Sequence, residues 1–190
     1  LYPNTLLVPL MLVGPNVPSS PDGARREDPV RQIDLGRTLL DLSGLYSTPF
    51  PGTNLLEEGK GNDIRYSMSA NGTSAAVMTS EWFFAMHLKD HRVNAGFEMT
   101  IAHTTELYDL QEDPRCLTNR AKEERERARE MRRMLVAWLT NSEQKGWTVT
   151  RNYQDLDALE QLAALGYTTV APQRGARTWI DLDCDCERCA

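Results

Sequence analysis

The chain has 190 residues, with 21 basic and 27 acidic side chains, a net charge of −6 and a pI near 5.1. This balance excludes the usual nucleic-acid binder, whose phosphate contacts need clustered Lys and Arg. The longest apolar run, residues 6–13, contains Pro9 and is too short to span a bilayer, so no membrane span is expected. The chain begins at Leu1, without an initiator Met, and we expect it to be a piece of a longer protein.

The run at residues 6–13 is continuous and is stopped by Gly14 and Pro15. Such a run predicts a strand buried on both faces, as in a parallel sheet covered by helices. Asp34 is then predicted as the N-cap of a helix over residues 35–43, and Gly44 as its left-handed stop. The apolar face of that helix consists of Leu35, Leu39 and Leu42.

Two strands are predicted farther along, roughly at residues 75–88 and 97–110. The eight-residue connection between them favours an antiparallel pair, since a parallel crossover needs a longer link. A long helix is predicted over residues 117–140, with eleven charges in the fourteen positions 120–133 on its solvated face. Its apolar stripe is Ala128, Met131, Leu135 and Trp138. A last helix is predicted over residues 155–165.

The cysteines are unevenly placed, with Cys116 alone and three in the last seven residues, Cys184, Cys186 and Cys189. A disulfide framework would distribute them through the fold. The three closely spaced thiolates can supply a zinc or other soft-metal site, but a closed tetrahedral site needs a fourth ligand. Cys116 or a partner chain would have to provide it. The alternative is that this tail is a disordered end.

Other candidate groups have structural interpretations. His87 and His91 would share one face of a strand but lie too far apart for shared ligation, and His103 is interpreted as a partly buried strand histidine. Residues 89–96 are interpreted as a solvated hairpin turn. Cys116 and Arg120 have the spacing of a C-x-(P/A)-x-R motif, but Thr118 replaces the Pro or Ala, so Cys116 is interpreted as a packing or surface residue.

Several segments, in order, resemble the C-terminal part of the sulfatase family, within the alkaline-phosphatase-like superfamily. VPLML at residues 8–12, followed by Gly-Pro, is similar to a strand and loop of that family. The segments VRQIDLGRTLLDLSG and GTNLL, at residues 30–44 and 52–56, resemble its V-x-x-(V/I)-D-L-x-P-T-L-L-D-L-A-G and G-x-S-L-L. ELYDLQEDP at residues 106–114 resembles E-L-Y-D-L-x-x-D-P, and LAALGY at residues 162–167 resembles L-x-x-L-G-Y. Gly36 lies in a region where the family often has Pro.

This resemblance implies an α/β fold: the last strand and helix of an alkaline-phosphatase-like sheet layer, plus a small antiparallel sheet subdomain with a packed long helix. Residues 1–60 would end the α/β domain, residues 61–167 would form the subdomain, and residues 168–190 would be the tail. In this family the nucleophile is an aldehyde hydrate made from Cys or Ser, and the metal is usually calcium held by Asp and Asn oxygens.

In the family's sequence order, the nucleophile and the calcium ligands both come before the VPL strand. We therefore expect a sulfuric ester hydrolase whose catalytic and metal-binding residues lie upstream, with no catalytic residue in this chain. The substrate would be a sulfated small molecule or sugar, and the location periplasmic or secreted; the oligomeric state is left open. The alternatives are a phosphodiester or phosphonate hydrolase or phosphoglycerol transferase of the same superfamily, and a non-catalytic interaction module with a metal-binding Cys tail.

Overall fold

The computed structural model describes residues 2–15, 17, 27–45, 50–57, 63–69, 72–92, 98–144, 184 and 186. Its elements, in chain order, are helices α1 (Pro3–Leu6) and α2 (Gln32–Leu42), strands β1 (Arg65–Met68), β2 (Ser74–Met78), β3 (Trp82–His87) and β4 (Thr105–Asp109), and helix α3 (Arg125–Gln144). The predicted helix over 155–165 lies outside the described residues.

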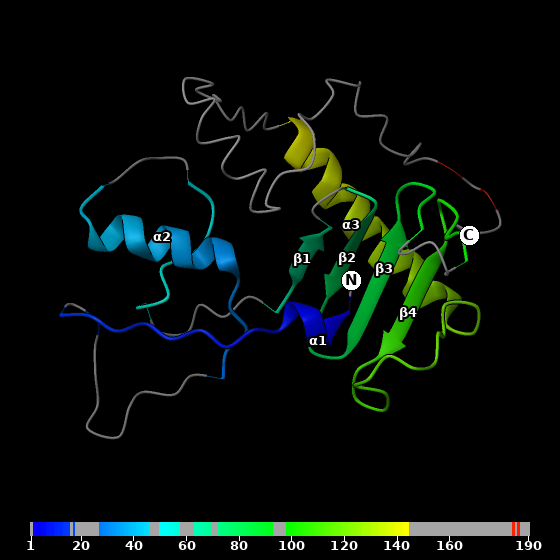
Figure 1. Cartoon of the computed structure of the whole chain (residues 1–190), viewed down its shortest axis with the longest axis horizontal. Helices are drawn as coiled ribbons and strands as arrows, with labels where there is room; N and C mark the ends of the chain where they lie inside the picture. Colours follow the sequence, from blue (N-terminus) through cyan, green and yellow to red (C-terminus); the bar gives the residue numbers. More distant parts are fainter. Residues whose placement is uncertain are drawn as a thin grey trace, which may run out of the picture.

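The four strands form one antiparallel sheet in the order β1-β2-β3-β4, so each strand pairs with the next in sequence (Figure 1). The antiparallel pairing predicted for the two strand candidates is confirmed, but the first candidate is two strands. The chain turns between β2 and β3, where the Thr79 hydroxyl accepts a hydrogen bond from the Trp82 backbone N–H at 2.9 Å. Strand β1 is an element that the sequence patterns did not predict.

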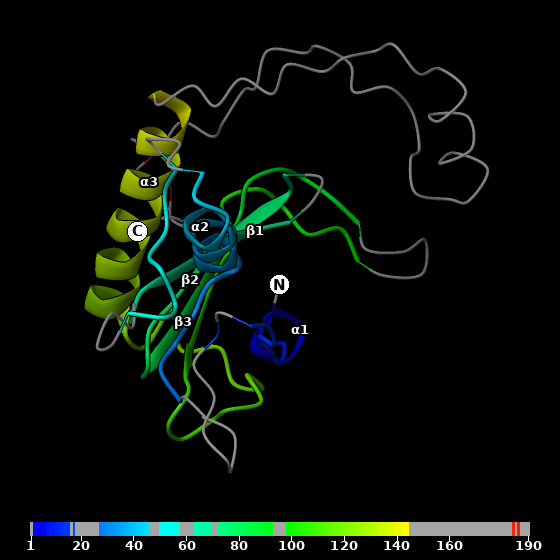
Figure 2. The same ribbon diagram turned by 90° about the vertical axis from the view of Figure 1, so that its left-hand side faces the viewer.

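Side chains alternate between the two faces of this sheet, and each face is covered. Helix α3 packs on one face, and α1 lies on the other (Figure 2). The face under α3 carries Ala75, Val77, Phe84, Met86 and Leu107, together with Met131, Leu135 and Leu139 of the helix. The opposite face carries Ala76, Met78, Phe83, Ala85 and Tyr108, with Cys116 and the partly buried Leu6 and Leu110.

Helix α3 begins at Arg125, later than the predicted start at residue 117. The intervening chain is a loop, because the Asp113 carboxylate accepts hydrogen bonds from the backbone N–H groups of Leu117 and Thr118 at 2.7 and 2.8 Å. The predicted apolar stripe does face the sheet, with Met131 and Leu135 buried and Trp138 stacked on Tyr66 at a centroid distance of 5.1 Å. None of the helices that the structure describes is long and apolar enough to cross a membrane.

The prediction of a buried strand over residues 6–13 differs from the structure. Pro3–Leu6 form the short helix α1, and residues 7–13 are extended chain outside any strand. Val8 is 76% exposed and Met11 85% exposed. Burial of such a run depends on neighbouring strands, and the described part of the chain places none beside it.

Helix α2 is present as predicted, but its N-cap is Arg31 and not Asp34. Asp34 occupies the third helical position, where its Oδ2 accepts the Arg31 backbone N–H at 2.9 Å. Of the predicted apolar face, Leu35 and Leu42 are half-buried but Leu39 is 50% exposed. The buried positions of the helix are Asp34 and Thr38. Gly44 has a positive φ of 67°, which confirms the predicted left-handed stop.

Polar pairing explains this burial, because α2 is held by the following segment, residues 50–57. The Asp34 carboxylate accepts the Thr53 backbone N–H at 2.9 Å, and the Thr38 hydroxyl accepts that of Leu55 at 2.8 Å. Gly36 faces Phe50: a Cβ there would lie 2.8 Å from the ring. A side chain at this position would displace that ring.

Candidate functional site

Glu106 of β4 is the centre of a hydrogen-bonded network on the sheet face opposite α3. Its Oε2 accepts the phenol protons of Tyr2 at 3.0 Å and Tyr108 at 2.8 Å. Its Oε1 lies 2.8 Å from the Nε2 of His87 in the neighbouring strand β3. The network therefore joins the residue before α1 to two strands of the sheet, across a sequence separation of 104 residues for Tyr2 and Glu106.

The electrostatics of this network favour an ionised carboxylate. Burial by itself raises the pKa of Glu106, but the hydrogen bonds from His87, Tyr108 and Tyr2 outweigh it, so the pKa lies below its usual value. Burial, followed by interaction with Glu106, raises the pKa values of Tyr108 and Tyr2. Both phenols thus stay protonated as donors. With three donors on two oxygens, this carboxylate is suited to structural pairing and not to accepting a proton.

His87 and His91 lie closer together than the strand interpretation predicted. Strand β3 ends at His87 and the chain turns, which brings the two rings to a centroid distance of 5.2 Å. His91 Nδ1 lies 3.0 Å from the backbone oxygen of Lys89. His87 is engaged by Glu106, so each ring has a protein partner.

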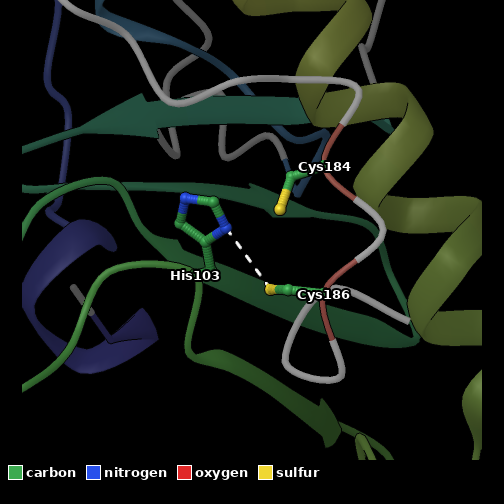
Figure 3. Close-up of side chains that lie close together, drawn as sticks. All are labelled: His103, Cys184 and Cys186. Carbon is green, nitrogen blue, oxygen red and sulfur yellow. Dashed lines mark hydrogen bonds between the residues drawn. The ribbon is translucent and has the colours of Figure 1, made fainter.

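A second cluster unites His103 with two cysteines of the tail, Cys184 and Cys186 (Figure 3). The imidazole Nδ1 of His103 lies 3.5 Å from Cys186 Sγ, and the ligand atoms of all three residues lie within 4.8 Å of one another. All three side chains are half-buried. Within the part of the chain that the structure describes, no other group of three or more His, Cys, Asp or Glu side chains is arranged to hold a metal ion.

The sequence pointed to only part of this cluster. The tail cysteines were candidate ligands, but His103 was interpreted as a strand residue, whereas it lies in the turn before β4 with a positive φ of 69°. Cys116, considered as a fourth ligand, is buried instead in the hydrophobic cluster on the sheet face opposite α3. Cys189 lies outside the described residues.

Cys116 fits the interpretation as a packing residue. Burial, with the nearby carboxylates of Asp113 and Glu106, raises the pKa of its thiol to about 11, which disfavours the reactive thiolate. Arg120, at the motif spacing, pairs with Glu112 at 2.7 Å. The C-x-x-x-R string is therefore part of a structural loop.

The calcium implied by the family resemblance does not fit the His–Cys cluster. Calcium takes six to eight oxygen ligands, whereas the cluster offers two sulfur atoms and an imidazole nitrogen. These donors suit softer ions such as zinc. The cluster thus suits a soft metal, whereas the resemblance implies calcium ligands upstream of this chain.

No family model matches the chain, and no curated protein matches it. Among solved structures, the chain is similar to a Bacteroides thetaiotaomicron protein from work on the metabolism of multiple glycosaminoglycans, at 22% identity and a TM-score of 0.45 over 56% of this chain and 24% of that one. It is also similar to yidJ of Bacteroides fragilis, assigned as a sulfatase, at 19% identity and a TM-score of 0.43 over 58% and 24%. A third, assigned as a sulfatase of B. thetaiotaomicron, has 20% identity and a TM-score of 0.43 over 64% and 27%. The chain spans about a quarter of the length of the sulfatase structures it resembles.

Proposed function

We propose that these residues are the C-terminal part of a sulfatase-type hydrolase, an enzyme that hydrolyses sulfuric esters. In this proposal the described sheet and α3 form a supporting subdomain. The reacting groups lie in residues upstream of this chain, so the chain alone is not a catalyst.

The observation that carries the proposal is the apolar segment at residues 7–13. Its sequence predicts a strand buried on both faces, yet Val8, Met11 and Val13 are 76%, 85% and 86% exposed. A contiguous run of exposed apolar side chains marks a surface that a partner covers. The partner that suits an extended apolar segment is the edge of a parallel sheet, which supplies neighbouring strands and helices on both faces. That is the position the family resemblance assigns to the VPL segment.

The Glu106 network gives independent support. The ELYDL segment, whose Glu106 and Tyr108 belong to β4, contacts Tyr2 just ahead of the VPL segment. The β4 segment and the chain just ahead of the VPL segment, far apart in sequence, thus meet through a half-buried ionised carboxylate. We infer that this contact holds the sheet subdomain against the α/β domain of the complete enzyme.

The cofactor and substrate follow from the same proposal. The calcium would be held by Asp and Asn side chains of the upstream part, where it would polarise the sulfate oxygens. The substrate class is a sulfate ester of a small molecule or sugar.

The test is to express the full-length coding sequence together with an aldehyde-generating enzyme and to assay an aryl sulfate with calcium. We expect turnover by the full-length protein and none by the 190-residue chain, which is the matched control. We also expect an upstream C-x-(P/A)-x-R motif, whose Cys or Ser changed to Ala abolishes turnover. Turnover by the 190-residue chain alone would disprove the proposal. Phosphodiester hydrolysis by a full-length protein with a Thr nucleophile and paired zinc ligands would equally do so.

A further inference from the structure

The His–Cys cluster brings together two regions that are about eighty residues apart in sequence. His103 lies in the connection between β3 and β4, and Cys184 and Cys186 belong to the tail. We propose that these three side chains bind a zinc ion. This inference is independent of sulfate-ester hydrolysis, whose calcium prefers oxygen ligands.

The spacing of the donor atoms fits zinc. Zinc–sulfur bonds of about 2.3 Å and zinc–nitrogen bonds of about 2.0 Å in a tetrahedron place sulfur and nitrogen about 3.5 Å apart, and two sulfurs about 3.8 Å apart. The His103 Nδ1 and Cys186 Sγ atoms are separated by 3.5 Å. The whole set lies within 4.8 Å, so small side-chain rotations bring the remaining sulfur to bonding distance. Figure 3 shows the three donor atoms directed into one space.

The backbone holds the histidine in place for this role. His103 has a left-handed φ of 69°, a conformation that is uncommon outside glycine. Its backbone N–H donates to the His87 carbonyl at 2.8 Å, and the adjacent Ala102 N–H donates to the Asp90 carboxylate at 2.7 Å. These bonds fix the turn before the metal arrives, which lowers the conformational cost of binding.

The cysteine segment is held from the other side by α3. The guanidinium of Arg132 donates to the backbone oxygen of Cys184 at 3.2 Å. Zinc at this place would join the tail, the connection before β4 and α3 in one unit.

The three described ligands leave one position of a tetrahedral zinc ion for a water molecule or another donor. Three-ligand sites of this kind exchange the fourth ligand, whereas closed four-ligand sites do not.

The experiment uses the 190-residue chain, reduced and stripped of metal. Zinc is added in equilibrium dialysis, and Co²⁺ is titrated as a spectroscopic probe. We expect about one zinc per chain and a thiolate-to-cobalt charge-transfer absorption in the near ultraviolet. Removing a residue that only hydrogen-bonds to a metal ligand typically lowers metal affinity 10–100-fold. Removing a ligand itself should cost more, so His103→Gln, Cys184→Ala and Cys186→Ala should each weaken zinc binding by more than about 100-fold. The matched control is Cys116→Ala, which removes a cysteine outside the cluster and should retain full affinity.

Thermal unfolding with and without zinc distinguishes a variant that has lost zinc binding from one that does not fold. Zinc should raise the Tm of the unaltered chain and of Cys116→Ala, but not that of the cluster variants. The inference is overturned if the unaltered chain binds no stoichiometric zinc, or if His103→Gln leaves affinity and the cobalt spectrum unchanged. Neither readout involves turnover, so failure here is distinguishable from failure of the proposed hydrolase function.

Discussion

Glu106 shows how one half-buried carboxylate can organise a sheet face. Its side chain is 16% exposed and is surrounded by donors from Tyr2, Tyr108 and His87. A buried charge is costly unless it is hydrogen-bonded, and here each oxygen has a partner. The residue therefore acts through pairing between segments.

The Glu106→Gln variant should reveal this pairing through its pH dependence. Because the folded pKa lies below the usual 4.5, the carboxylate stabilises the fold above that value, and this contribution is lost as pH falls through the folded pKa. We expect Glu106→Gln to cost about 1–3 kcal/mol at pH 7, since its amide group faces donors, and to cost progressively less below pH 4.5. Urea unfolding from pH 7 to pH 3 measures the difference.

Glu130→Gln on the exposed side of α3 is the control for this experiment, and it should change stability by less than about 0.5 kcal/mol at each pH. A cost of Glu106→Gln that stays constant across the titration would contradict the assigned role.

Helix α3 stabilises the sheet through a narrow apolar stripe. Most of its surface is charged, yet Met131, Leu135 and Leu139 are buried among side chains of β2, β3 and β4. Surface pairs such as Arg127 with Glu130 contribute little, because water screens them. The attachment of the helix therefore depends on the stripe.

Leu135→Ala tests that attachment, because this side chain is 0% exposed in the cluster under α3. Truncation leaves a cavity, and we expect a loss of about 2–5 kcal/mol in the free energy of unfolding. Leu117→Ala is the matched control, because Leu117 is 74% exposed and its truncation should cost less than about 0.5 kcal/mol. Equal losses in the two variants would show that α3 does not pack as described.

At the scale of the molecule, the sheet has two covered faces, while the segment at residues 7–13 has an uncovered apolar surface. Helix α2 lies on the β1 side of the sheet with its own partner segment (Figure 1). The described residues thus combine a sheet covered on both faces with an apolar segment that they leave exposed.

The double variant Val8→Ser with Met11→Ser tests whether the segment at residues 7–13 is exposed or is buried in the full-length protein. In the 190-residue chain both side chains are exposed, so stability should change by less than about 0.5 kcal/mol. In the full-length protein we expect both side chains to be buried. Each substitution should then lower the free energy of unfolding by about 1.5–3 kcal/mol. Denaturant unfolding of both forms measures this contrast. Val77→Ser, at a position 0% exposed, should destabilise both forms alike. An unaffected full-length protein would contradict burial of the segment.

The local patterns predicted much of the element order. The left-handed stop at Gly44 and the apolar stripe of α3 follow from short-range rules and are present. The division of residues 75–88 into two strands was missed, because the turn at Thr79 depends on hydrogen bonds that apolar periodicity does not encode. Asp34 was assigned the wrong helix position for a similar reason: its partners include Thr53, nineteen residues away.

The sequence by itself determined which residues can carry chemistry: three thiols in the tail, three histidines, and motif segments that resemble one family in order. Only the tertiary structure decided which of them meet. It placed His103 beside Cys184 and Cys186, buried Cys116 elsewhere, and joined Tyr2 to Glu106. The physical reason is that ligation and charge pairing depend on distances of a few ångströms between side chains, and sheet register and turns set those distances.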